Sequence, residues 1–477
     1  MPKNATQSAG APTSSYGLQA GALGPIETLA QSVSAVSPTT GSSLTVPLVF
    51  ALAGNGTWLV YLLATASILL VAYCISRFAR VSASPGSLYS YAAESLPPAF
   101  GAMAGWGLLI AYVATGASVA GGAMYYAILL AQQFLHWTIA PIAALAVICA
   151  IAGYIAYRDI KLSAGVMLWI EFVTLMVIVT VLAALMIHKG FHIDADQLSL
   201  KGLHFGSVGP ALVLAIFTFV GFESATTLGV EAREPLRTIP RAVLQCAILS
   251  GVFFLLCSYA EVLGFAGVSS SVIESTSPMH LLADRAGLPA LGLGMEIGAM
   301  VSNFACVLAC TNAAARVLLR MGRAGLVPEV LMRTSARRGT PTNATVVTGA
   351  LMFAGTTGMA MRGVNGYDMY DLAGSLAVFG FLTAYALVAV AAPFATRQNG
   401  RLPRLATVLA AVTVVVVVLI TVLDIRSSAD AAHARIPYLY LGYAGLGLAV
   451  FFAGRKRQQR EWMGEEVLGD EVAEPES

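Results

Sequence analysis

Two carboxylates lie inside long apolar stretches, where an ionised group is costly to bury. Glu171 occurs in the run Trp169–Leu175, and Glu223 occurs in a run that also holds Phe217, Gly221 and several hydroxyl residues. Acidic residues within membrane spans commonly belong to proton or ion pathways, because a buried carboxylate must be protonated or paired with a cation. The structural alternatives are a protonated glutamate hydrogen-bonded between helices at position 171 and a cap on free backbone N–H groups at position 223.

Helix breakers and hydroxyl residues gather in an apolar segment near the amino terminus. The run Gln31–Ser43 places Pro38 and Gly41 among serines and threonines. Proline removes a backbone donor and glycine loosens the next turn, so the run predicts an interruption near the middle of a helix. A second interruption is expected at Gly221, two residues before Glu223. A simple proline kink is the alternative at Pro38.

The usual signatures of catalysis do not occur in the sequence. It contains no P-loop, nucleophile elbow, metal-ligand pair or histidine cluster, and its histidines are assigned to loops or helix ends. The six cysteines all lie in apolar segments, so no disulfide framework is predicted. We therefore expect a protein that is not an enzyme and has no cofactor or metal site.

The elements that hold these residues must be membrane-spanning helices. Of the 477 residues, 57% are hydrophobic and only 11% are charged, whereas soluble proteins carry about 25% charged residues. The mean hydropathy is +0.76. A water-facing surface for a chain of this length cannot be built from so few charges, so the sequence predicts an integral membrane protein. A net charge of +2 gives no indication of a nucleic-acid partner.

Apolar segments of about 20 residues, the length that spans a bilayer, divide the chain into twelve predicted spans. We expect a disordered cytoplasmic leader at 1–23, a helical membrane domain at 24–455 and a cytoplasmic tail at 456–477. The spans fall near 26–52, 57–80, 99–132, 138–157, 162–187, 208–229, 239–265, 289–315, 343–361, 369–394, 404–423 and 436–453.

The basic residues predict the orientation of these spans. Lysine and arginine are retained on the cytoplasmic side of a membrane. With both termini inside, 21 of the 27 basic residues lie in inner segments and six lie outside. This alternation supports twelve spans with both termini in the cytoplasm. The excess of arginine over lysine indicates a GC-rich bacterium and hence an inner membrane.

The two interrupted spans occupy corresponding places in the chain. Spans one and six each begin a unit of five spans, and an odd number inverts the second unit relative to the first. The repeats cover about 24–190 and 205–395, with two additional helices over about 404–453. Interrupted helices at matching positions indicate the binding site of a secondary transporter, and their free N–H groups suit an anionic group such as a carboxylate.

Several motifs resemble those of one family. The run Phe217–Gly229, followed by Val230–Arg241, is similar to the span-six signature of amino-acid permeases in the amino acid–polyamine–organocation superfamily. Ser84–Tyr91, Gly105-Trp106 and Arg316–Pro328 agree with that resemblance, which covers roughly residues 24–395. It implies an all-α membrane protein with the five-plus-five inverted-repeat fold, and transport of an amino acid or amine.

The resemblance and the interruptions together predict the site residues. Phe217 matches an aromatic gate of the arginine–agmatine antiporter branch, and Glu223 matches a position that responds to pH there. Thr174 stands where many proton-coupled members carry a lysine, so we expect Glu171, Thr174 and Glu223 to serve proton coupling. The predicted substrate-binding residues are Ser37, Pro38, Thr39, Thr40, Gly41, Ser42, Phe217, Gly221, Phe222, Glu223 and Tyr112.

The sequence departs from the family in the first span, where Pro38 replaces a run of glycines, and after span six, where the acidic pair is reduced to Val230-Glu231. Ordinary packing is the alternative for Phe217. Thr226/Thr227 and Ser302/Asn303 are alternative oxygen ligands for sodium.

We expect a secondary transporter, either a proton-coupled symporter or an exchanger. With no base in the expected cavity, a neutral amino acid is favoured over a dicarboxylic one, which would need arginine or lysine. A permease or antiporter for polyamines or cationic amines is the alternative, and a channel is the alternative from another class.

Overall fold

The computed structural model describes residues 14–190, 194–201, 203–268, 278–335, 338–395, 403–426 and 432–454. These residues form helices and contain no strand, apart from one isolated bridge between Leu23 and Ala232. The tail expected at 456–477 lies outside the described residues.

The α-helices follow one another with short connections. They are α1 (Pro25–Val36), α2 (Pro38–Thr40), α3 (Val46–Ala53), α4 (Thr57–Ala79), α5 (Leu88–Ser95), α6 (Pro98–Leu130), α7 (Pro141–Arg158), α8 (Ile160–His188), α9 (Ala195–Leu198), α10 (Phe205–Phe217), α11 (Pro235–Phe265), α13 (Pro278–Arg285), α14 (Pro289–Arg323), α15 (Thr342–Ala360), α16 (Gly366–Ala395), α17 (Arg404–Arg426) and α18 (Ile436–Ala453).

Shorter helical turns of other types join some of these helices. The turns η1 (Gly41–Thr45) and η3 (Ala131–Leu135) are π-helical, and the 3₁₀ turns are η2 (Gly54–Gly56), η4 (Ser224–Leu228), η5 (Glu329–Met332) and η6 (His433–Arg435).

Local sequence explains where several of the long helices begin. Pro98, Pro141, Pro235 and Pro289 each stand at the first helical position of α6, α7, α11 and α14. A proline at this position does not destabilise the helix, because the first N–H groups of a helix have no internal partner. At α8 the cap is a side chain instead, since Asp159 accepts a hydrogen bond of 2.7 Å from the Lys161 amide.

In the described part of the chain, nine helical segments are long and apolar enough to cross a membrane. Pro25–Ala79 counts as one of these segments, although it holds two of the twelve predicted spans. The predicted span at 208–229 overlaps the shorter apolar helix Gly206–Phe217, and α15 is not among the nine. The chain is therefore an all-helical, multi-pass protein, and the number twelve stays a prediction.

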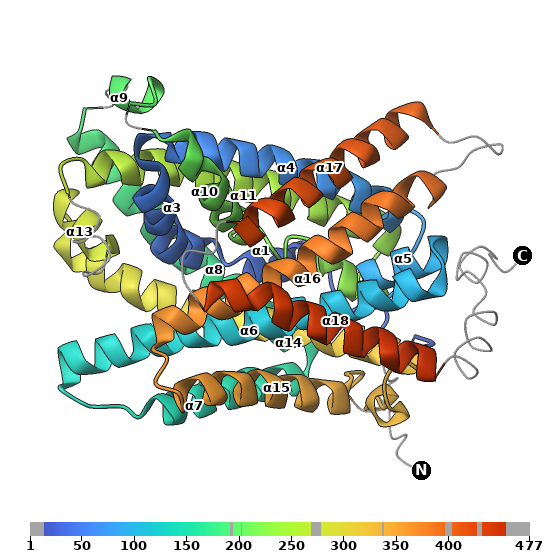
Figure 1. Ribbon diagram of the computed structural model, residues 1–477. Coiled ribbons are helices and arrows are strands. Elements are labelled where there is room, and N and C mark those ends of the chain that lie inside the picture. Colours follow the sequence, from blue (N-terminus) through green and yellow to red (C-terminus); the bar gives the residue numbers. More distant parts are fainter. Residues whose placement is uncertain are drawn as a thin grey trace, which may run out of the picture.

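Helices α6, α14 and α16 form the interior, with α7 and α15 along one edge of the molecule in Figure 1. The most apolar window of Pro98–Leu135 is 89% buried, against 28% for Pro141–Arg158. Small residues let α6 and α16 approach closely, because a Cβ on Gly380 would lie 2.4 Å from the Gly107 carbonyl oxygen. The peripheral helices expose apolar side chains to lipid, and the polar residues of interest lie among the central ones.

The segment before α1 differs in part from the disordered leader expected at 1–23. Residues 1–13 lie outside the described residues, but Leu18 is fully buried and packs with Tyr16 and Leu319. The Leu23 amide donates to the Glu231 carbonyl at 2.9 Å. Contacts with distant elements therefore hold residues 14–23, which sequence composition alone does not predict.

Candidate functional site

The helical path of the first predicted span changes direction at Ser37. Helix α1 ends at Val36, Ser37 adopts left-handed angles (φ 50°, ψ 67°), and α2 starts directly at Pro38. A non-glycine residue in this region is uncommon and is retained where neighbours fix it. Here the Ser37 hydroxyl donates to the Thr40 hydroxyl at 2.7 Å. The π-helical turn η1 then leads into α3.

The sixth predicted span changes course in a similar way. Helix α10 ends at Phe217, and the chain passes through a series of turns to η4. Within them Gly221 has φ +94°, a conformation that side chains with a Cβ rarely adopt. A Cβ at this glycine would also lie 2.9 Å from the Ala35 carbonyl oxygen. Gly221 is therefore required both by its backbone angle and by its close approach to α1.

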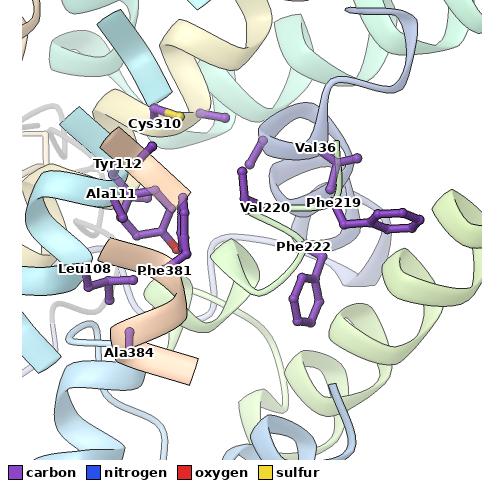
Figure 2. Packing of buried hydrophobic residues seen from close by; sticks show 14 of the residues in the cluster. Val36, Leu108, Ala111, Tyr112, Phe219, Val220, Phe222, Cys310, Phe381 and Ala384 are labelled. Atoms are coloured by element: carbon purple, nitrogen blue, oxygen red, sulfur yellow. The ribbon is translucent and has the colours of Figure 1, made fainter. Parts of the chain in front are cut away.

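The two irregular segments, one around Ser37 and one around Gly221, lie against each other. The Ser224 hydroxyl donates to the Gln31 carbonyl at 3.1 Å, and the Ala225 amide donates to the Ser32 hydroxyl at 2.9 Å. Val36, Phe219 and Val220 belong to one cluster of buried hydrophobic residues (Figure 2). Residues nearly 200 positions apart in the chain thus meet where these two irregular segments touch.

Glu171 lies on α8 next to the first of these segments. The Ser302 hydroxyl of α14 donates to the Glu171 carboxylate at 3.0 Å and lies 2.9 Å from the Ser37 hydroxyl. One turn along α8, Thr174 accepts a hydrogen bond of 3.0 Å from Thr39. Two links therefore join this face of α8 to the irregular segment at Ser37. The second oxygen of Glu171 has no hydrogen-bond partner among the described residues.

Glu223 is held from two other helices. The hydroxyl of Tyr112 on α6 donates to one carboxylate oxygen at 2.8 Å, and that of Tyr385 on α16 donates to the other at 2.7 Å. All three side chains are fully buried or nearly so. Tyr112 also packs edge-to-face on Phe381, with ring centroids 5.3 Å apart (Figure 2). Sequence reasoning included Tyr112 and missed Tyr385, whose only signal is a hydroxyl within an apolar span.

Phe217 is the last residue of α10, and its ring packs against that of Tyr370. Its ring meets that of Tyr370 edge-to-face at 5.6 Å, and a Cβ on Gly374 would lie 2.4 Å from the Phe217 ring. The Tyr370 hydroxyl lies 3.0 Å from that of Thr45, just beyond the first interruption. An aromatic pair thus joins the two irregular segments to α16.

The other predicted residues lie in the same region with different contacts. Ser42 donates to Glu261 of α11 at 2.6 Å, a partner that sequence reasoning missed. Phe222 packs against Tyr385, with ring centroids 5.7 Å apart. A Cβ on Gly41 would meet the ring of Phe254 at 2.6 Å. These residues face α11 and α16 as well as each other.

The oxygens considered as sodium ligands mostly have partners within the chain. Thr226 bonds Ser87, and Thr227 donates to the Ser224 carbonyl at 2.6 Å. The Asn303 amide nitrogen donates to the Ala299 carbonyl at 2.9 Å, whereas the Asn303 side-chain oxygen has no hydrogen-bond partner among the described residues. Among the described residues, no group of three or more His, Cys, Asp or Glu side chains is placed to hold a metal ion.

A buried ion pair joins α14 to the segment that follows η4. The Arg316 guanidinium binds both oxygens of Glu231, at 2.5 and 2.7 Å, and also donates to the Asn312 carbonyl at 2.9 Å. Asn312 in turn donates to the Ser163 hydroxyl at 2.6 Å. Glu231, read in the sequence as a remnant of an acidic pair, is therefore joined to α14 and through it to α8.

The chain is similar to known transport proteins over most of its length. A family model described as amino acid permease matches residues 23–446. A transporter of Mycobacterium tuberculosis, described as uncharacterized, is 28% identical over 416 residues, which cover 85% of this chain and 86% of the relative.

Two further relatives have named substrates. The branched-chain amino acid permease of Bacillus subtilis is 25% identical over 376 residues, covering 74% of this chain and 76% of the relative. The low-affinity putrescine importer of Escherichia coli K12 is 25% identical over 343 residues, covering 69% and 71%. The relatives are thus transporters whose named substrates are amino acids or amines.

Proposed function

Because this chain belongs to the amino acid permease family, we propose that it is a secondary active transporter that moves an amino acid by alternating access. The observation that carries the proposal is the contact between the two irregular segments, where Gly221 lies against Ala35. We place the substrate there, at residues 37–42 and 217–223. The free N–H groups of interrupted helices suit the substrate carboxylate, and free carbonyl groups suit its ammonium.

The proposal includes the membrane arrangement that the sequence predicts. The chain has twelve spans in a five-plus-five inverted repeat with interrupted first and sixth spans. Both termini lie in the cytoplasm, and the membrane is a bacterial inner membrane. The asymmetric distribution of lysine and arginine supports this orientation.

The contacts of Glu223 favour a neutral amino acid over a diamine. Both of its carboxylate oxygens already accept hydrogen bonds, from Tyr112 and Tyr385. In this conformation the carboxylate joins three helices, so a second amine would compete for it with two tyrosine hydroxyl groups. The named substrate of the branched-chain relative agrees with this choice. The putrescine relative motivates the alternative, transport of a polyamine or cationic amine.

Glu171 is the proposed coupling group. Its carboxylate is buried and receives one hydrogen bond, from Ser302, which also contacts Ser37 at the interruption. Burial disfavours the charged form, so proton binding and release at Glu171 bias the two cavity orientations. This arrangement suits proton-coupled symport, and the same site without proton transfer suits exchange.

Uptake by vesicles tests the proposal. The purified protein is reconstituted and offered radiolabelled leucine, alanine, arginine, glutamate and putrescine, without ATP and with an imposed proton gradient. We expect saturable, concentrative uptake of leucine or alanine, with empty vesicles as the control. Non-saturable flux that only follows the substrate gradient indicates a channel and contradicts the proposal. Uptake of putrescine alone favours the cationic alternative.

A further inference from the structure

A second buried carboxyl group lies on the other side of the first interruption. Glu261 belongs to α11, two turns beyond Phe254, whose ring faces Gly41. Its side chain is fully buried, and one carboxyl oxygen accepts a hydrogen bond of 2.6 Å from Ser42. The other oxygen has no hydrogen-bond partner among the described residues.

The surroundings of Glu261 supply hydroxyl groups and apolar side chains. Tyr61 of α4 and Cys257 of α11 lie near it, and both are buried. Helix α8 contributes only apolar side chains to the cluster beside Cys257, which contains Ile178, Val181, Leu182 and Leu185.

No basic side chain of the described residues forms an ion pair with Glu261. Helix α13 also packs against α11, and its Arg285 donates to the carbonyls of Gly264 and Ala266, at 2.6 and 2.9 Å. On the same helix, His280 faces Glu296 at 3.7 Å, and Asp284 is exposed.

An ionised carboxylate in these surroundings has one hydroxyl donor and no counter-charge. Burial of such a charge is unfavourable, and one neutral hydrogen bond does not offset the lost hydration. A bound proton removes the charge. The conformation with Glu261 buried therefore favours the protonated carboxyl group.

We propose that Glu261 is a second proton-binding site, which takes up one proton when the chain after the interruption closes on α11 and releases it when this contact opens. The step adds a proton to a carboxylate and requires no other reactant. Glu171 contacts Ser37 through Ser302, whereas Glu261 contacts Ser42, so the two carboxyl groups hold opposite ends of the 37–42 segment. The role in coupling rests on the proposed transport function, but proton binding itself does not.

Infrared difference spectroscopy of the full-length protein in lipid vesicles tests proton binding directly. Spectra at high and low pH show carboxylic acid C=O bands that appear on protonation. We expect Glu261→Gln to lose one such band that Glu171→Gln retains. Ser42→Ala should move the titration midpoint of that band, and Ser43→Ala should not, because the neighbouring Ser43 hydroxyl has no hydrogen-bond partner.

The outcomes separate this inference from the proposed function. Identical titrations of Glu261→Gln and the parent overturn it, and so does a Glu261 band that is unchanged across the pH range. A band that depends on sodium rather than on pH identifies a sodium site and also overturns it. If Glu261→Gln does not fold, the Ser42→Ala and Ser43→Ala pair decides the question. Leucine uptake by the same vesicles reports separately on the transport proposal, because loss of uptake in the parent leaves the infrared result unaffected.

Discussion

At the scale of single residues, the central polar groups differ mainly in how many partners they have. Glu223 accepts a hydrogen bond from a tyrosine hydroxyl on each oxygen, whereas Glu171 and Glu261 each have one oxygen without a hydrogen-bond partner in the part of the chain that the structure describes. A fully bonded carboxylate is rigid and joins the helices around it. A half-bonded one is better suited to gain and lose a proton. This difference supports the proposed roles of Glu171 and Glu261 in proton exchange and of Glu223 as a link between helices.

We expect Glu171→Gln to retain substrate exchange and to lose uphill uptake driven by a pH gradient. Glutamine keeps the shape and the Ser302 contact but cannot titrate, so the cavity still changes orientation without moving a proton. Counterflow and gradient-driven uptake of leucine, measured on the same vesicles, distinguish the two activities. Glu296→Gln serves as a control, because Glu296 is a buried carboxyl group of α14 that is not bonded to Ser37. Normal gradient-driven accumulation by Glu171→Gln would make Glu171 structural.

Tyr385→Phe should destabilise the protein by about 1–3 kcal/mol, because it removes a buried hydrogen bond to a carboxylate. Tyr91→Phe is a matched control, since the buried Tyr91 hydroxyl has no hydrogen-bond partner. Thermal unfolding of the detergent-purified variants measures the difference. Equal melting temperatures of the two variants would show that the Tyr385 contact contributes little to stability.

At the scale of elements, the two irregular segments are a joint unit rather than two separate kinks. Ser37 takes a left-handed conformation, Gly221 has a positive φ, and hydrogen bonds from Ser224 and Ala225 run to α1. Strained backbone of this kind persists where the surroundings fix it. A change to either segment is therefore expected to disturb the other.

Gly221→Val and Pro38→Leu should each abolish substrate binding while expression stays near normal. Valine at 221 disfavours the positive φ and meets the Ala35 backbone, and leucine at 38 restores an amide donor that lets the helix continue. Binding of labelled leucine to purified protein measures the effect. Gly206→Ala on α10 is the control, because nothing lies within 4 Å of a Cβ at that position. Unchanged affinity in both test variants would remove these segments from the site.

At the scale of the whole molecule, the chain is joined at one end by a buried ion pair. Arg316 of α14 binds Glu231, whose carbonyl accepts the Leu23 amide from the segment before α1. Three distant parts of the sequence thus meet at one point.

Arg316→Met should destabilise the protein by about 3–5 kcal/mol, because it leaves the Glu231 carboxylate buried without a counter-charge. The double variant Glu231→Leu/Arg316→Met should recover much of this loss, since no charge then remains. The exposed pair of Arg237 and Glu234, at 3.4 Å, provides the control. Arg237→Met should cost about 0–1 kcal/mol. Thermal unfolding measures all three, and a double variant no better than Arg316→Met would contradict this account.

The sequence by itself determined the properties that depend on composition and local stereochemistry. Few charges and long apolar runs require an all-helical membrane protein, and the span-six motif indicates the permease family that the comparison shows. Pro38 and Gly221 are local signals, because each acts on the backbone around it. Glu171 and Glu223 could be singled out for the same reason, as charges in apolar runs.

Only the tertiary structure decided which groups these residues meet. Tyr385 lies 162 positions from Glu223, and Glu261 lies 219 positions from Ser42, so no local pattern relates them. The packing of residues 14–23 against Leu319 and Glu231 is equally non-local. Hydrogen bonds act over about 3 Å, and such distances between remote residues are set only when the helices pack. The number of partners on each carboxylate, and hence its proposed role, is therefore a property of the folded molecule.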